Sequence, residues 1–289
     1  MSGVGSRESA TGSGQAGAAP AAIGESSAGA AASPAAGQPW DDAIGPLVAL
    51  PSPDGLGAAL FMRDTTMTAA TDVEMFTHDE QTTRATLLPG TVLGCAWVRA
   101  ATVSGATTGA PVVWALALAP GVARPLPLDA IVDLSPRDSS ALAIRVSRLV
   151  SALAEDSASM PFQGLPVVVR DAWQTRLRDG TRVVMAVAER SLGTESNPRA
   201  EIVTLVAEPE SASQTAAWRT VFFRRDAGLE DRVEGADLLA ALLLRGTTPT
   251  MVLVRETDHG PAVDFVERIT PGAWQVRWTT ASLPCTNTN

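Results

Sequence analysis

Residues 233–246 read VEGADLLAALLLRG, and this stretch decides the predicted fold. Its leucines recur at the spacing of one helical face, at Leu238, Leu239, Leu242 and Leu243. Gly246 follows them, and glycine is the residue that most often ends a helix. The pattern therefore predicts an amphipathic helix that ends at Gly246.

Three short strands are predicted after this helix. Met251–Arg255 is a short apolar run, and the turn residues Asp258-His259-Gly260 separate it from Val263–Arg268. Pro271-Gly272 has the sequence of a type II turn. Trp274–Trp278 then alternates apolar and polar residues, which is typical of a strand with one buried face. The end of the chain is therefore predicted as antiparallel hairpins.

A second helix is predicted upstream. Ser135 can cap it, Pro136 suits the first helical position, and Asp138 can return the capping bond. Its apolar residues recur at helical spacing, at Leu142, Val146, Leu149, Val150 and Leu153. Between the two helices, Asp179-Gly180 is a strong signal for a two-residue hairpin turn. The strands predicted here are 165–177, 182–190, 201–207 and 218–224.

The N-terminal part divides into a tail and an extended region. Residues 1–39 are mostly Gly, Ala, Ser and Pro, so they bury too little apolar surface to offset their ordering entropy. We predict a disordered tail there and a globular region over 40–285, which can divide into sub-domains 40–160 and 161–285. Residues 41–124 read as mainly extended, with a hairpin around Thr102–Gly109.

Together these elements predict an α+β fold. It consists mainly of antiparallel sheets built from hairpins, with two principal packing helices. Four carboxylates at the start of the last predicted helix are interpreted as favourable charges at its N-terminus rather than as a catalytic pair: Glu230, Asp231, Glu234 and Asp237. Four tryptophans on predicted strands are interpreted as core residues rather than as the lining of a ligand groove: Trp173, Trp218, Trp274 and Trp278.

The composition limits the classes of partner. The formal net charge of −9 and the pI near 4.8 disfavour nucleic acid and anionic membrane surfaces. No run of about 18 apolar residues is present, so no membrane span is predicted. No secretory signal is visible, so we predict a cytoplasmic location. The chain has no Lys and no Tyr, a bias typical of high-GC bacterial genes.

Cys95 and Cys285 are the two cysteines of the chain. Two free thiols are the favoured interpretation, because the predicted compartment is reducing. The alternative is a Cys95–Cys285 disulfide in an exported protein. A zinc site is disfavoured, because two lone cysteines lack the close spacing of zinc ligands.

Two histidines limit the candidates for acid–base chemistry. His78 lies in the densest acidic segment, so His78 and Asp79 are the first catalytic candidates, and His259 in a predicted turn is the third. The candidate metal ligands come from the same acidic segment: Asp72, Glu74, His78 and Glu80. Because adjacent side chains diverge in a helix or strand, a solvated turn is the favoured interpretation of this segment.

These observations favour a non-catalytic function. The lysine-bearing phosphate loop is excluded because the chain has no Lys. We therefore predict a non-catalytic binding or accessory protein without a cofactor, whose partner is a protein or a small-molecule ligand. The alternative is a hydrolase or metal-dependent enzyme centred on His78 and the neighbouring carboxylates.

Overall fold

The structure, a computed structural model, describes a set of segments that lie within one compact unit of the chain, Ala31–Asn289. The described residues are 47–51, 58–61, 71–76, 82–87, 98–101, 103–104, 115–193, 197–211, 213, 216–257 and 260–279. The predicted tail lies outside them. The boundaries at residues 39 and 160 stay predictions.

The α+β prediction is wrong, because the described residues form three antiparallel sheets and one α-helix. The first sheet has the strand order β5 (Val98–Ala101), β2 (Ala58–Phe61), β1 (Leu47–Pro51), β7 (Ala115–Leu118), β3 (Thr71–Phe76), β4 (Thr82–Leu87) and β6 (Val103–Ser104). The second has the order β13 (Trp218–Leu229), β12 (Arg199–Pro209), β11 (Arg182–Leu192), β10 (Val168–Arg176) and β9 (Asp129–Ala130). The third has the order β17 (Ala273–Thr279), β16 (Gly260–Thr270), β15 (Thr248–Thr257), β14 (Ala236–Leu244) and β8 (Ala123–Pro125).

The leucine-rich stretch that predicted a helix is strand β14. Its apolar side chains are buried on both faces of the sheet, and a register shift lies between Leu238 and Ala240. A strand buried on both faces reads as a continuous apolar run, which periodicity cannot distinguish from a buried helix. Gly246 ends the element as a turn residue: Arg245 and Gly246 have φ of 50° and 71°, and Thr247 N donates to Leu244 O.

The second and third sheets share one topology. Each is a four-stranded meander, β10–β13 or β14–β17, in which consecutive strands pair. Each meander also gains a short edge strand from the segment before α1, because β9 pairs with β10 and β8 pairs with β14. The segment 123–130 therefore contributes one strand to each sheet.

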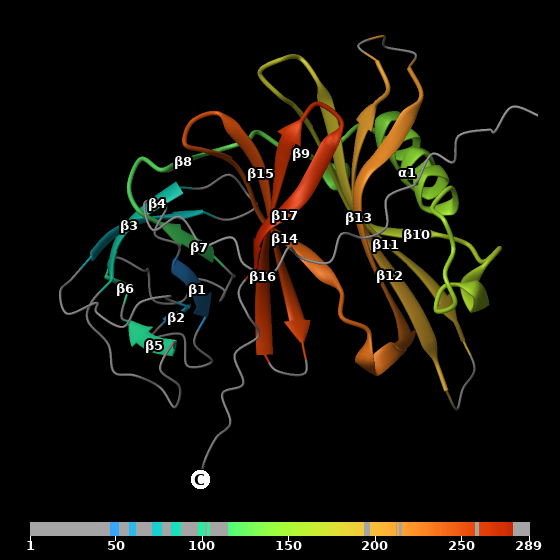
Figure 1. Cartoon of the computed structure of the whole chain (residues 1–289), viewed down its shortest axis with the longest axis horizontal. Helices are drawn as coiled ribbons and strands as arrows, with labels where there is room; N and C mark the ends of the chain where they lie inside the picture. The colour runs from blue at the N-terminus through green and yellow to red at the C-terminus, as the bar shows by residue number, and fades with distance from the viewer. Residues whose placement is uncertain are drawn as a thin grey trace, which may run out of the picture. The chain divides into compact units, whose positions relative to one another are not determined.

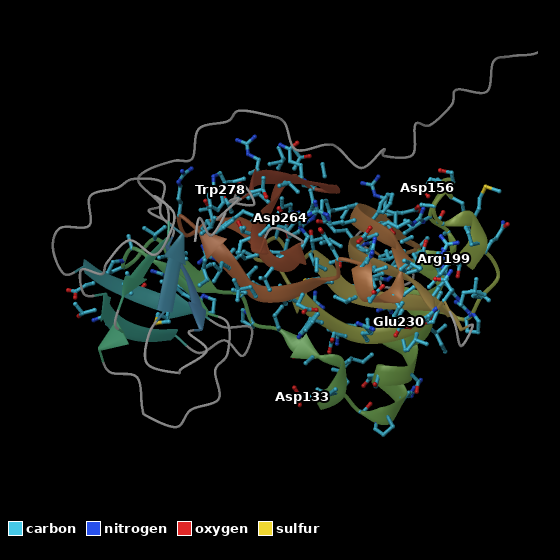
Figure 2. All side chains as sticks on the ribbon, turned by 90° about the horizontal axis from the view of Figure 1, so that it is seen from below. Asp133, Asp156, Arg199, Glu230, Asp264 and Trp278 are labelled. Carbon is cyan, nitrogen blue, oxygen red and sulfur yellow. The ribbon has the colours of Figure 1, made fainter. Side chains whose placement is uncertain are left out.

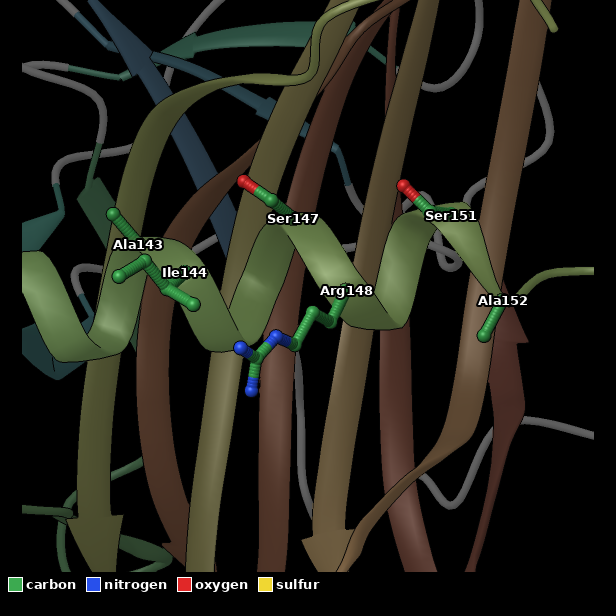
Figure 3. Close-up of a pocket in the computed structure, with 6 residues that line it drawn as sticks. All are labelled: Ala143, Ile144, Ser147, Arg148, Ser151 and Ala152. Atoms are coloured by element: carbon green, nitrogen blue, oxygen red, sulfur yellow. The ribbon is translucent and has the colours of Figure 1, made fainter. Parts of the chain in front are cut away.

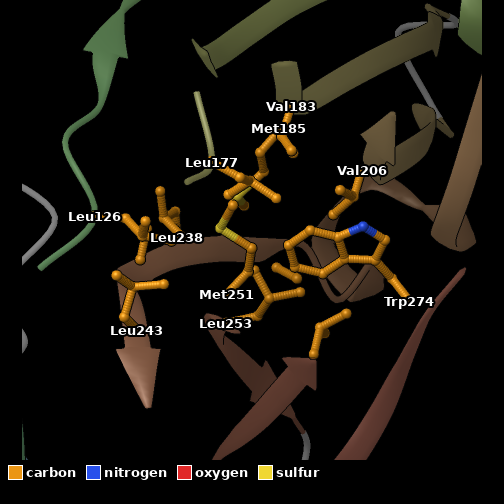
Figure 4. Packing of buried hydrophobic residues seen from close by; sticks show 13 residues of the cluster. Leu126, Leu177, Val183, Met185, Val206, Leu238, Leu243, Met251, Leu253 and Trp274 are labelled. Carbon is orange, nitrogen blue, oxygen red and sulfur yellow. The ribbon is translucent and has the colours of Figure 1, made fainter. Parts of the chain in front are cut away.

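Three hydrophobic cores join the elements in layers, as Figure 1 shows for α1, β10–β13 and β14–β17. Helix α1 (Pro136–Ser151) packs on the second sheet through Val146 and Leu149, against Val184 and Leu205. The opposite face of the second sheet packs on the third. Figure 4 shows this second core, which contains Leu177, Met185, Val206, Met251, Leu253 and Trp274. Phe76, Leu116 and Leu118 of the first sheet cover the outer face of the third, where Leu239 and Phe265 lie.

The upstream helix is confirmed as α1. Asp138 N donates to Ser135 Oγ at 3.2 Å, and Pro136 is the first helical residue. The Ser135 hydroxyl donates to Asp138 Oδ2 at 2.7 Å, so the carboxylate accepts from the side chain of Ser135 rather than from its backbone N–H, as a capping box would have it. The buried residues are Leu142, Val146, Leu149 and Val150, as the spacing predicts. This is the one α-helix in the part of the chain that the structure describes.

The hairpin predictions have mixed outcomes. The hairpin at Asp179-Gly180 is confirmed between β10 and β11, but its turn is longer than the predicted two residues, because Gly180 N donates to Leu177 O. The strands predicted from 165 to 224 correspond to β10–β13. The hairpin predicted around Thr102–Gly109 is wrong. Strands β5 and β6 pair with β2 and β4, while β7 pairs with β1 and β3. Within the described ranges, no helix is long and apolar enough to cross a membrane.

Candidate functional site

The two described members of the acidic segment make structural contacts. Asp72 lies on β3 opposite Thr86 and accepts a hydrogen bond from its hydroxyl at 2.9 Å. Glu74 accepts a bond from Gly121 N at 3.0 Å and lies 3.7 Å from Arg84 Nε. These bonds tie β3 to its neighbours. His78, Asp79, Glu80 and His259 lie outside the described residues, so their predicted roles stay predictions, as does the state of Cys95 and Cys285.

A buried carboxylate, Glu208 of β12, joins the second and third sheets. It accepts hydrogen bonds from Arg268 Nε at 2.8 Å, from Trp274 Nε1 at 2.6 Å and from Gly272 N at 2.9 Å. Arg268 also donates to Asp179 Oδ2 at 2.6 Å and to Thr181 Oγ1 at 3.1 Å. Because several charge-assisted bonds meet at Glu208, this network fixes how the two sheets pack.

A second buried carboxylate, Glu201, lies on the α1 side of the second sheet and is fully buried. Arg190 Nε donates to it, and Arg225 Nε lies 3.2 Å from its other oxygen. The same two guanidiniums donate to Phe162 O at 3.1 Å and to Ala154 O at 2.8 Å. They therefore hold the segment after α1 onto the sheet.

Within the described residues, some buried donors of the Glu201 centre have no hydrogen-bond partner. The Nη2 atoms of Arg190 and Arg225 are buried and have no hydrogen-bond partner there. The nearby Glu155 and Asp156 lie 3.5 Å and 3.7 Å from the guanidiniums, so three carboxylates surround two cations. A paired buried centre of this kind suits a structural role.

The third charged centre surrounds Asp264, which lies among the strands of the sheets in Figure 2. Arg224 of β13 donates to Asp264, and Arg255 Nε donates to it at 2.9 Å. Arg255 also reaches Glu234 Oε2 at 3.1 Å. This centre and the Glu208 network both join the second sheet to the third.

The carboxylates interpreted as helix N-terminal charges have another role, because the helix is absent. Glu230 and Asp231 lie in a short 3-10 turn, and Glu234 pairs with Arg255. Asp237 is exposed on β14. In the described segments, no group of three or more His, Cys, Asp or Glu side chains is placed to hold a metal ion. The four tryptophans pack on or within the cores, as predicted.

A different cluster lies where α1 meets β11 and β13. The guanidinium carbon of Arg145 is 4.5 Å from the centroid of the Trp218 ring, and that of Arg182 is 5.3 Å from it. Burial and the positive charge of Arg182 lower the pKa of Arg145. No ion pair between Arg145 and a carboxylate occurs within the described part of the chain. We name Arg145, Arg182 and Trp218 the Arg–Trp cluster.

The exposed side of α1 forms a shallow groove. Its lining residues are Ala143, Ile144, Ser147, Arg148, Ser151 and Ala152. Figure 3 shows α1 crossing the strands, with Ser147 and Ser151 on one side and Arg148 on the other. Ile144 is 53% exposed, so an apolar side chain lies next to a cation on this surface. Burial of Ile144 against another molecule would be favourable.

The charge of α1 differs from that of the chain. Its 16 residues contain three arginines and one aspartate, which gives a net charge of +2, whereas the whole chain carries −9. The helix is therefore a local basic surface on an acidic protein. Sequence reasoning missed the Arg–Trp cluster because its members come from three elements, and no spacing along the chain brings them together.

Comparisons with known proteins identify no relative. No protein-family model matches the chain, and neither a curated protein nor a solved structure is similar to it.

Proposed function

We propose that this chain is a non-catalytic binding protein whose partner is an acidic protein that docks on α1. The observation that carries the proposal is the α1 groove, where the exposed Ile144 lies beside Arg148 on a helix of net charge +2. Apolar contact supplies affinity, and the basic helix attracts an acidic surface and orients it.

The use of the buried charges supports the same function. Glu201, Glu208 and Asp264 each bind two or more donors or cations that join neighbouring layers. Because these three carboxylates and their partners fix the layers to one another, the sheets form a rigid support for α1. A rigid support favours binding because little conformational entropy is lost when the partner docks.

The experiment places a photo-reactive amino acid at Ser147, inside the groove, and separately at Thr247, an exposed turn residue of the third sheet. Illumination of cells of the source organism should give one discrete adduct from position 147 and none from 247. The partner identified in that adduct, once purified, should bind the chain, and Ile144→Asp should weaken binding at least tenfold.

Two outcomes would contradict this function. The first is an identical set of adducts from both positions, or a purified partner that binds wild type and Ile144→Asp equally. The second is tight binding of a divalent cation in calorimetry that disappears in His78→Ala, which would support the hydrolase or metal-dependent alternative. The bacterial source, which rests on the composition, and the cytoplasmic location remain parts of the proposal.

A further inference from the structure

We propose that the Glu201 centre is a binding site for one buried water molecule, which joins the guanidiniums of Arg190 and Arg225 to the Glu201 carboxylate. The water accepts hydrogen bonds from the Nη2 atoms of both arginines and donates one to Glu201 Oε1. The site lies under the segment that follows α1 and shares no residue with the α1 groove.

Buried polar atoms without partners are the first argument. Four atoms of this centre have no hydrogen-bond partner within the described segments: Arg190 Nη2, Arg225 Nε, Arg225 Nη2 and Glu201 Oε1. The side chains are 4%, 6% and 0% exposed for Arg190, Arg225 and Glu201, so bulk solvent does not reach these atoms. An unpaired buried group costs free energy, and folded proteins pair almost all such groups with protein atoms or ordered water.

The geometry of the guanidiniums brings these atoms to one place. In a guanidinium, the Nε–H and one Nη2–H point outwards along the same edge. Arg190 Nε donates to Glu201 Oε2, and Arg225 Nε lies 3.2 Å from Glu201 Oε1, so both of these edges face one carboxylate. The Nη1 atoms have other partners, because they donate to Phe162 O at 3.1 Å and to Ala154 O at 2.8 Å.

Strand pairing fixes the three side chains on one face of the second sheet. Arg190 and Glu201 are directly opposite each other on β11 and β12. Arg225 of β13 is opposite Val203, which lies two residues along β12 from Glu201 and belongs to the core under α1. Because alternate residues of a strand share a face, all three side chains point to the α1 side of the sheet.

The charge of the centre selects a neutral ligand. Glu201, Glu155 and Asp156 already surround the two cations, and an added anion would lie close to the Glu201 carboxylate. An anion also only accepts hydrogen bonds, so it would leave Glu201 Oε1 without a donor. Water both accepts and donates, and a buried water typically makes about three hydrogen bonds. Two Nη2 donors and one carboxylate oxygen match that requirement.

The first test is a high-resolution crystal structure of the full-length protein, with a second crystal soaked in sodium bromide. We expect a density peak that refines as water and lies about 2.7–3.2 Å from both Nη2 atoms and from Glu201 Oε1. The bromide soak should give no anomalous signal at this position.

The second test counts long-lived waters in solution by oxygen-17 magnetic relaxation dispersion. Globular proteins hold about one buried water per 27 residues, so only a difference between variants isolates this site. Arg225→Met should lose one long-lived water, and Arg190→Met is the second variant if that protein does not fold. The control is Arg224→Met, which removes the neighbouring arginine of β13 from its ion pair with Asp264 and should keep the wild-type count.

Several results would overturn the inference. An anomalous bromide signal at the position would identify an anion site instead. Density in which both Nη2 atoms bond protein groups, with no peak between them, would exclude a ligand. Equal counts of long-lived waters in wild type and Arg225→Met, or an equal loss in Arg225→Met and Arg224→Met, would show that this centre holds no water of its own.

Discussion

Arg268 shows how single residues use charge in this protein. Its guanidinium bonds Glu208, Asp179 and Thr181 together, so one side chain connects β12, the β10–β11 turn and β16. These contacts change the pKa of Asp179. Burial raises its pKa, but hydrogen bonds from Arg268 and from the backbone and side chain of Thr181 outweigh burial and lower the pKa of Asp179 to about 2.

This shift predicts a pH-dependent stability difference between wild type and Asp179→Asn. Because the folded pKa is lower than the ordinary value of about 3.9, the stabilisation is complete above that value and is lost as the pH falls towards 2. We expect Asp179→Asn to be less stable than wild type at pH 7, and the difference to shrink between pH 4 and pH 2. Urea unfolding at several pH values measures it. A difference that is constant with pH would contradict the assigned contact.

At the scale of elements, burial on two faces decides the structure of β14. Leu239, Leu242 and Leu244 face the first sheet, while Leu238 and Leu243 face the second. The sequence shows that 236–244 is apolar, but it does not show that partners cover both sides. Those partners come from distant parts of the chain, so propensity and periodicity alone selected the wrong element.

Other elements were predictable because their signals are local. Ser135, Pro136 and Asp138 form the cap of α1 within four residues, and Gly180 ends the turn between β10 and β11 with a φ of 84°. The meander β14–β17 was recovered except for its first strand. In the acidic segment, the sequence singled out Asp72 and Glu74 as candidate metal ligands. Their hydrogen-bond partners, Thr86 and Gly121, could not be predicted because they depend on strand pairing.

Leu244→Ala distinguishes a strand from the helix expected at this position. Leu244 lies off the apolar face of the predicted helix, so its truncation there would cost little. In β14 it is 2% exposed and belongs to the core between the first and third sheets. We expect a loss of about 2–5 kcal/mol in the free energy of unfolding, measured by urea denaturation. Thr247→Ala in the exposed turn is the control, and an equal, small effect of both changes would argue against β14.

At the scale of the molecule, two sets of charges have separate roles. Those at Glu201, Glu208 and Asp264 are buried between layers and stabilise the stack of sheets. Those of α1 and the Arg–Trp cluster lie at the outer layer and give the acidic protein a basic surface there. The stack is closed by α1 on the second sheet and by the first sheet on the third, so the helix proposed to bind the partner is an outer layer.

The most direct test of this separation measures, for wild type, Glu208→Gln and Ile144→Asp, the stability to urea and the affinity for the partner identified through position 147. Glu208→Gln should lose about 3–5 kcal/mol, because Arg268 stays buried and keeps only the partly exposed Asp179 as a charged partner. It should keep the wild-type affinity for the partner. Ile144→Asp should lose less than about 1 kcal/mol of stability, because the side chain is 53% exposed, and should bind the partner at least tenfold more weakly. Loss of affinity in Glu208→Gln, or wild-type affinity in Ile144→Asp, would contradict the account.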